Sequence, residues 1–152
     1  MESPFQAPAV VLDTNVVLDW LVFKDPGVTP LGTAVAAGAL RWLACARMRD
    51  ELADVLAREH LRRWQPDAAA VLAAFDRHAG LQAAPPPSHL PCSDADDQVF
   101  IDLALVAGCR WLLTKDRALL ALARRARPRG LRVLTPAGWL AEKDGAAAKA
   151  AA

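Results

Sequence analysis

The sequence predicts an α/β fold, a three-layer α/β/α sandwich around a short parallel sheet of about four to five strands. Short apolar runs alternate along the chain with longer stretches of helical spacing. Such alternation is typical of a parallel sheet whose crossover helices cover both faces. The length of 152 residues is that of about one domain. We therefore expect a single domain over 1–142, followed by an alanine-rich tail over 143–152 that frays.

The expected strands are short and apolar. The first, over 9–12, is a continuous run of alanine, valine and leucine, which is typical of a strand buried on both faces. The remaining strands are expected over 41–44, 81–84, 111–113 and 131–134.

The expected helices fill the segments between these strands. Apolar residues at helical spacing indicate a helix over 46–63. Pro66 suits the start of the next helix, over 67–78, and Gly80 is expected to end it. The proline-rich segment 85–91 is expected to form a stiff surface loop. Further helices are expected over 16–23, 31–40, 94–107, 117–125 and 136–142.

Charge and cysteine content exclude several classes of protein. Eighteen lysines and arginines stand against 17 aspartates and glutamates, for a formal net charge of +1. A generally basic nucleic-acid coat is therefore excluded, and a polyanion would need a local basic patch. The three cysteines are too scattered for a disulfide framework, and no signal peptide or apolar span is apparent. We expect a cytoplasmic protein that does not enter a membrane.

Acidic residues follow the predicted strands at positions that bring them together. Asp13 comes directly after the first strand, and Asp116 closely follows the fourth. A third acidic group, over 94–97, begins the helix that leads into that fourth strand, and Glu51 lies in the helix after the second. Ligands of parallel sheets bind beyond the carboxyl ends of the strands. We therefore expect these acids to converge on one edge of the sheet.

Clustered carboxylates indicate a divalent cation. They repel one another, and their pKa values rise unless a cation is present. Oxygen ligands favour Mg²⁺ or Mn²⁺ over zinc, and the histidines and cysteines form no convincing ligand set. Mg²⁺ held by carboxylates and a phosphate can orient a water, lower its pKa and neutralise a leaving oxygen. The acids therefore predict metal-assisted phosphodiester hydrolysis.

Each acid also has a structural alternative. Asp13 and Asp116 could each cap the helix that follows. Asp94 and Asp96 could serve the amino end of their helix through capping and the helix dipole. Glu51 taken alone could be an exposed helical glutamate. These alternatives stay open for single residues, whereas the joint placement favours a site.

Five segments follow one another in a specific order. They read VVLDTNV, RDEL, DADDQVFI, WLLTKD and LRVLTP, over 10–16, 49–52, 94–101, 111–116 and 131–136. This ordered set resembles the PIN-domain ribonucleases, and among them most the toxins of toxin–antitoxin pairs. The resemblance implies a Mg²⁺- or Mn²⁺-dependent endoribonuclease that hydrolyses RNA. The alternative is a catalytically weak PIN-like module that binds RNA or protein.

The resemblance also implies roles for single residues. The metal-binding and catalytic acids would be Asp13, Glu51, Asp97 and Asp116. Asp96 is a substitute ligand for Asp97, because the register of that loop is hard to fix from one sequence. Asn15 and Thr114 stand where the family supports its ligands through hydrogen bonds. The implied partners are an RNA substrate and an antitoxin protein, and a second copy of the chain is a further candidate.

Basic and aromatic residues provide candidate contacts beyond the acids. Lys115 stands where the family often has a small residue, and its ammonium is a candidate contact for the RNA phosphate. Arg58 and Arg62 belong to a basic cluster that could bind RNA or simply be solvated. Trp20, Trp42 and Trp64 could stack on bases, although aromatic residues at such positions more often lie in a core or interface.

Overall fold

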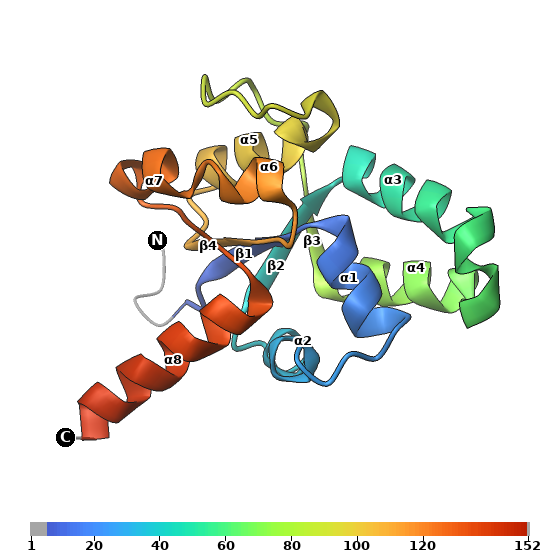
Figure 1. The fold of residues 1–152 in the computed structure, drawn as a ribbon, viewed down its shortest axis with the longest axis horizontal. Coiled ribbons are helices and arrows are strands. Elements are labelled where there is room, and N and C mark those ends of the chain that lie inside the picture. The colour runs from blue at the N-terminus through green and yellow to red at the C-terminus, as the bar shows by residue number, and fades with distance from the viewer. Residues whose placement is uncertain (1–5, 152) are drawn as a thin grey trace.

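Five short parallel strands form the centre of the molecule, in the spatial order β3-β2-β1-β4-β5 (Figure 1). The computed structural model describes residues 6–151, and the side chains of 6–145. Every neighbouring pair of strands is parallel, which confirms the predicted fold class. The strands are β1 (Ala9–Leu12), β2 (Arg41–Cys45), β3 (Ala79–Gln82), β4 (Trp111–Leu113) and β5 (Arg132–Leu134).

Helices cover both faces of this sheet. In Figure 1, α5, α6 and α7 lie on one side and α1 to α4 on the other, while α8 packs against α2 and β5. The α-helices are α1 (Thr14–Leu21), α2 (Thr29–Ala36), α3 (Ala46–Leu56), α4 (Ala68–His78), α5 (Gln98–Val106), α6 (Arg117–Leu120), α7 (Ala123–Ala126) and α8 (Pro136–Ala151). Short 3₁₀ turns add η1 (Glu59–Trp64), η2 (Ala95–Asp97) and η3 (Arg127–Arg129). None of the helices in the described part of the chain could cross a bilayer.

The strand order reverses at β1, and this reversal positions the site. From β1 the chain builds β2 and β3 outward on one side, then returns to place β4 and β5 on the other. The register pairs Leu12 with Leu113, so the residues that follow them emerge side by side. The N–H of Asp13 continues the ladder by donating to the carbonyl of Leu113 at 3.0 Å. Such a switch point is where open α/β sheets bind ligands.

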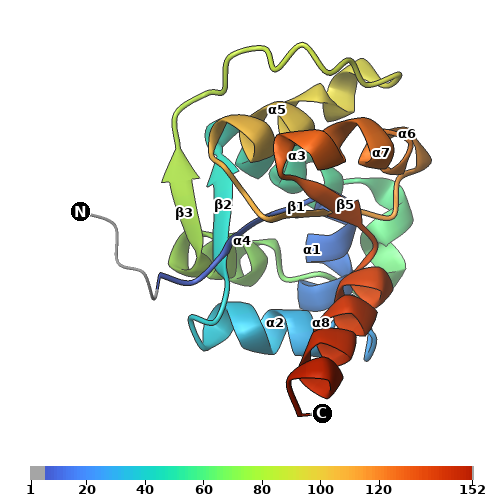
Figure 2. The same ribbon diagram turned by 90° about the vertical axis from the view of Figure 1, so that its left-hand side faces the viewer.

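Several element boundaries differ from the sequence-based expectation. Gly80 lies inside β3 rather than at the end of α4, and a Cβ there would come within 3.2 Å of Leu43. Figure 2 shows β3 at one edge of the sheet, with the segment after it passing over α5. The helix expected over 117–125 is divided into α6 and α7.

The last helix runs further than the sequence indicates. It was expected over 136–142, but α8 continues through Ala151, because alanine has the highest intrinsic helix propensity. Fraying of this tail stays a prediction. Residues 1–5, which the single-domain prediction includes, and Ala152 lie outside the described residues.

Candidate metal centre at the strand switch point

Asp13 lies at the centre of the switch point and is only 4% exposed. Its Oδ1 accepts a hydrogen bond of 2.7 Å from the N–H of Thr14 at the start of α1. Its Oδ2 accepts one of 2.6 Å from the hydroxyl of Thr114. Asp13 thus caps a helix and also faces the end of the neighbouring strand. The two roles are compatible, because its two oxygens point to different partners.

The pKa of Asp13 is raised by its burial and by neighbouring acids. Burial raises its pKa to about 6, although the hydrogen bonds from Thr114 and Thr14 act in the opposite direction. The negative charges of Glu51 and Asp116 raise this pKa further. Asp13 is therefore close enough to both residues for their charges to disfavour its ionised form.

Three other carboxylates form a tight group beside it. Oxygens of Asp94, Asp97 and Asp116 all lie within 4.8 Å of one another. Asp97 is buried at the end of η2, and burial raises its pKa to about 7, with Asp116, Asp13 and Asp94 adding to the shift. Its Oδ2 is buried and has no hydrogen-bond partner among the described residues. A buried oxygen of this kind is costly unless a cation or proton meets it.

Glu51 joins the site from α3, which packs against α1. The hydroxyl of Thr14 donates to its Oε2 at 2.5 Å, so the residue after Asp13 holds Glu51 in place. Glu51 is half-buried and lines a polar hollow of about 210 Å³ together with Arg58 and Asp96. The alternative of a freely solvated glutamate is therefore wrong.

Asp94 and Asp96 differ in their relation to the other acids. Asp96 is exposed, and its N–H donates to Oδ1 of Asp94 at 3.0 Å. The acid that groups with Asp97 and Asp116 is Asp94, which also caps η2. The only sequence signal for Asp94 was its place at the head of an acidic run, where capping explained it equally well.

Thr114 forms hydrogen bonds with the acids of the site, whereas the side-chain oxygen of Asn15 has no hydrogen-bond partner among the described residues. Thr114 is fully buried, and its hydroxyl accepts from the N–H of Asp116 at 2.9 Å while it donates to Asp13. It therefore links two acids directly. The Oδ1 of Asn15 is buried with no hydrogen-bond partner among the described residues. Its support of the ligands stays a prediction.

Lys115 has a partner within the chain, and its contact with an RNA phosphate stays a prediction. Its ammonium forms an ion pair with Asp19 of α1, which is buried. A contact with an RNA phosphate would have to break this pair and leave a buried carboxylate without its counter-ion. The exposed Arg62 makes only a loose pair with Glu59, at 3.8 Å, and remains a candidate contact.

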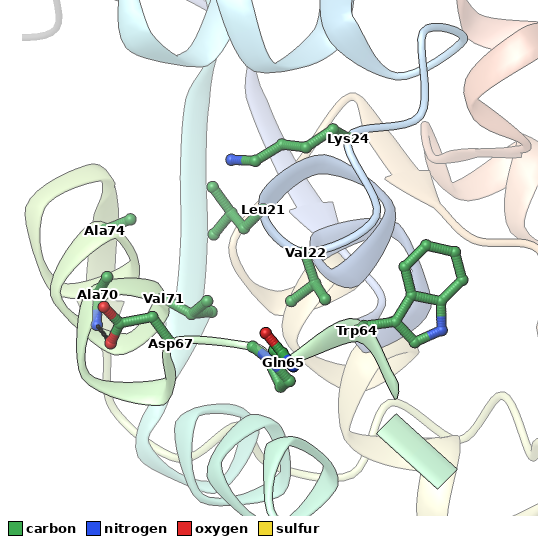
Figure 3. A pocket seen from close by; sticks show the side chains of 10 residues that line it. Leu21, Val22, Lys24, Trp64, Gln65, Asp67, Ala70, Val71 and Ala74 are labelled. Carbon is green, nitrogen blue, oxygen red and sulfur yellow. Dashed lines mark hydrogen bonds between the residues drawn. The ribbon is translucent and has the colours of Figure 1, made fainter. Parts of the chain in front are cut away.

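A separate hollow of about 350 Å³ lies between the end of α1, η1 and α4. Its floor is aliphatic, with Leu21, Val22 and Val71 among its lining residues (Figure 3). None of the clustered acids lines it. The clustered acids and this aliphatic hollow are thus in different parts of the surface.

A parallel sheet with acids gathered at its switch point defines a class of α/β proteins with a candidate metal centre. Within that class, the family model of the PIN domain matches residues 9–118. The chain belongs to the PIN-domain family. The match covers β1 to β4 and all of the acids described above.

Two solved structures share the fold. One is the crystal structure of VapBC2 from Rickettsia felis bound to a DNA fragment from its promoter. The matched chain has 11% sequence identity to this one and a TM-score of 0.56, and the match covers 82% of this chain and 96% of that chain. PAE2754 from Pyrobaculum aerophilum is 18% identical with a TM-score of 0.52, covering 78% of this chain and 87% of that one. No curated protein sequence matches the chain.

Proposed function

We propose that this PIN-domain protein is an endoribonuclease that requires a divalent metal ion and acts as the toxin of a toxin–antitoxin pair. The observation that carries the proposal is the buried Oδ2 of Asp97, without a partner among the described residues, within a group of three carboxylates. A carboxylate cluster of this kind is destabilising by itself. A bound cation would neutralise this repulsion and would explain why the carboxylates lie so close together.

The donor set suits Mg²⁺ or Mn²⁺. Every candidate ligand is a carboxylate oxygen, which hard cations prefer. Asp94, Asp97 and Asp116 would hold the ion, with Asp13 and Glu51 adjoining them. The raised pKa values of Asp13 and Asp97 support this assignment, because a nearby positive charge would relieve the same repulsion that raises them.

The proposed chemistry is attack of water on the phosphorus of an RNA phosphodiester, with cleavage of one phosphorus–oxygen bond. When bound, the ion supplies Lewis acidity that polarises the phosphate and neutralises charge on the leaving oxygen. Glu51 is the candidate general base: Thr14 occupies Oε2, and Oε1 has no hydrogen-bond partner among the described residues. Oε1 would take the proton of the attacking water. Thr114 would keep Asp13 and Asp116 in a fixed relative orientation.

The toxin role is supported by the fold shared with VapBC2 from Rickettsia felis and by membership of the PIN family. In this role the partners are an RNA substrate in the cytoplasm and an antitoxin protein that blocks cleavage. A second copy of the chain is a further candidate partner.

Cleavage of RNA by the purified protein tests the proposal. We expect turnover with Mg²⁺ or Mn²⁺, none with EDTA, and a loss of roughly 100-fold or more in Asp97→Asn and Asp116→Asn. Asp144→Asn is the matched control, because Asp144 is an exposed acid of α8. Equal cleavage by all of these proteins would mean a contaminating nuclease or a wrong site. Metal-independent RNA binding without turnover would favour the binding-module alternative.

A further inference from the structure

Trp64 is an aromatic side chain that the fold leaves on the surface. It is 46% exposed, whereas Trp42, Trp111 and Trp139 are buried. In Figure 3 its indole extends away from the α4 side of the aliphatic hollow. A single exposed apolar side chain is ordinary on a protein surface, so what Trp64 could bind depends on the groups around it.

The backbone holds Trp64 in a defined position. Leu61, in the same 3₁₀ turn, is 3% exposed and anchors that turn in the core. The turn ends at Gln65, which adopts a left-handed backbone with φ of 44°, and Pro66 follows. A non-glycine residue in this conformation is uncommon and is over-represented at ligand-binding segments. Trp64 is therefore presented by a fixed corner of the chain.

Beside the indole lies a hollow of about 470 Å³, here called the aromatic hollow. It is lined by Phe23, His60, Leu61, Arg63 and Trp64. Three of these side chains are π systems, one is a guanidinium, and none is a carboxylate. Phe23 contacts the indole edge-on with ring centroids 4.8 Å apart, and the guanidinium of Arg63 lies 5.3 Å from its centroid. Flat aromatic faces beside cations are the chemistry that binds unpaired nucleobases.

The charges around the aromatic hollow are those that phosphates would meet favourably. Arg58 lies two residues before His60 and Arg62 lies between Leu61 and Arg63, and both arginines are exposed. Arg58 also lines the polar hollow that contains Glu51, so basic residues connect the aromatic hollow to the acids. Glu59 is the acidic residue of this turn, and it pairs loosely with Arg62.

We propose that the aromatic hollow binds an unpaired base of single-stranded RNA, stacked on Trp64, in a part of the substrate beyond the scissile phosphate. The inference rests on the proposed function for the identity of the ligand as RNA. An aliphatic peptide groove is less favoured here, because the lining contributes a single aliphatic side chain.

The test is binding of a fluorescein-labelled single-stranded RNA of about 12 nucleotides, within the range that such surfaces occupy. Fluorescence anisotropy in EDTA measures affinity without requiring cleavage. We expect Trp64→Ala to weaken binding roughly 5- to 150-fold, since a stacked base contributes that much. Trp64→Phe, which keeps an aromatic face, should recover most of the affinity. Val106→Ala is the matched control, because Val106 is 56% exposed at the far end of α5.

The outcomes separate this inference from the proposed function. Loss in Trp64→Ala with recovery in Trp64→Phe supports the aromatic hollow, even if the wild type cleaves no RNA. Equal affinity of Trp64→Ala and wild type overturns the inference, even if cleavage is metal-dependent. An equal loss on a duplex of the same sequence also overturns it, because paired bases cannot enter the hollow. Unchanged RNA affinity together with a changed sedimentation mass would make Trp64 part of a protein interface, and would overturn it too.

Discussion

The hydroxyl of Thr114 donates a hydrogen bond of 2.6 Å to Oδ2 of Asp13, and so joins the ends of two parallel strands that are 101 residues apart in sequence. The hydroxyl oxygen of Thr114 also accepts a hydrogen bond from the N–H of Asp116. One small side chain therefore fixes the relative positions of two acids. Each of its contacts is buried or half-buried, so water cannot replace them at low cost.

Replacement of Thr114 by valine should lower both the stability of the fold and its affinity for the metal ion, although the two side chains have similar shapes. Valine has nearly the same volume but leaves Oδ2 of Asp13 without its donor, at a cost of about 1–3 kcal/mol in stability. The pKa of Asp13 should rise, because the lost hydrogen bond acts to lower it. Urea unfolding and calorimetric titration with Mn²⁺ measure both effects. Thr114→Ser keeps the hydroxyl and should behave as wild type; a metal affinity that is the same in Thr114→Val would contradict the prediction.

Stability without metal should fall as the pH rises. The pKa values of Asp13 and Asp97 are raised in the folded protein to about 6 and about 7, above their ordinary 3.8. A group of this kind stabilises the fold fully below its unfolded pKa and loses that contribution as the pH rises through the folded value. The free energy of unfolding in EDTA should therefore be higher at about pH 5 than at about pH 8. Denaturant titrations at the two pH values measure it.

The control for this pH dependence is Asp13→Asn/Asp97→Asn, which removes both titrating groups and should flatten the profile. Mg²⁺ should flatten it in the wild type as well, because a cation stabilises the ionised carboxylates of the folded state. A wild-type profile in EDTA that is already flat between these pH values would show that the two acids are not strained by their neighbours.

The ion pair between Lys115 and Asp19 should matter for folding. Lys115→Met removes the counter-ion of a buried carboxylate, and we expect a loss of about 1–3 kcal/mol. Asp19→Asn should cost less, because Lys115 is 48% exposed and can turn to water. Thermal and urea unfolding compare the two. The double variant Asp19→Asn/Lys115→Met should be more stable than Lys115→Met alone, and an additive loss would argue against a direct pairing.

Gly32 should tolerate no side chain, although it lies in a helix. A Cβ at this position would lie 2.1 Å from Nε1 of Trp20, where α2 packs against α1. Gly32→Ala should therefore destabilise the fold by about 1–3 kcal/mol despite alanine's better helix propensity. Gly145→Ala in α8 is the matched control: its Cβ meets open space, and it should stabilise slightly. Chemical unfolding of the two variants should give shifts of opposite sign.

The sequence was sufficient for the architecture and for the neighbourhood of the site. Strand-end positions placed Asp13 and Asp116 at one edge, because parallel strands end together there. The finer arrangement depended on packing that no periodicity encodes. Asp94 rather than Asp96 joins the acids, and the ion pair of Lys115 with Asp19 was not foreseen. Gly80 was misplaced because a glycine after a helix usually ends it, whereas here it allows β3 to approach Leu43.

The reversal of strand order has a consequence for synthesis of the protein. Asp13 leaves the ribosome early, but its donor Thr114 and its neighbour Asp116 follow only when more than two thirds of the chain has been made. A chain that has not yet reached Asp116 holds the first acid without the second, so it cannot assemble the centre. Every chain that stops short of Thr114 therefore holds Asp13 without the hydroxyl that fixes it, and only longer chains can bring these acids together.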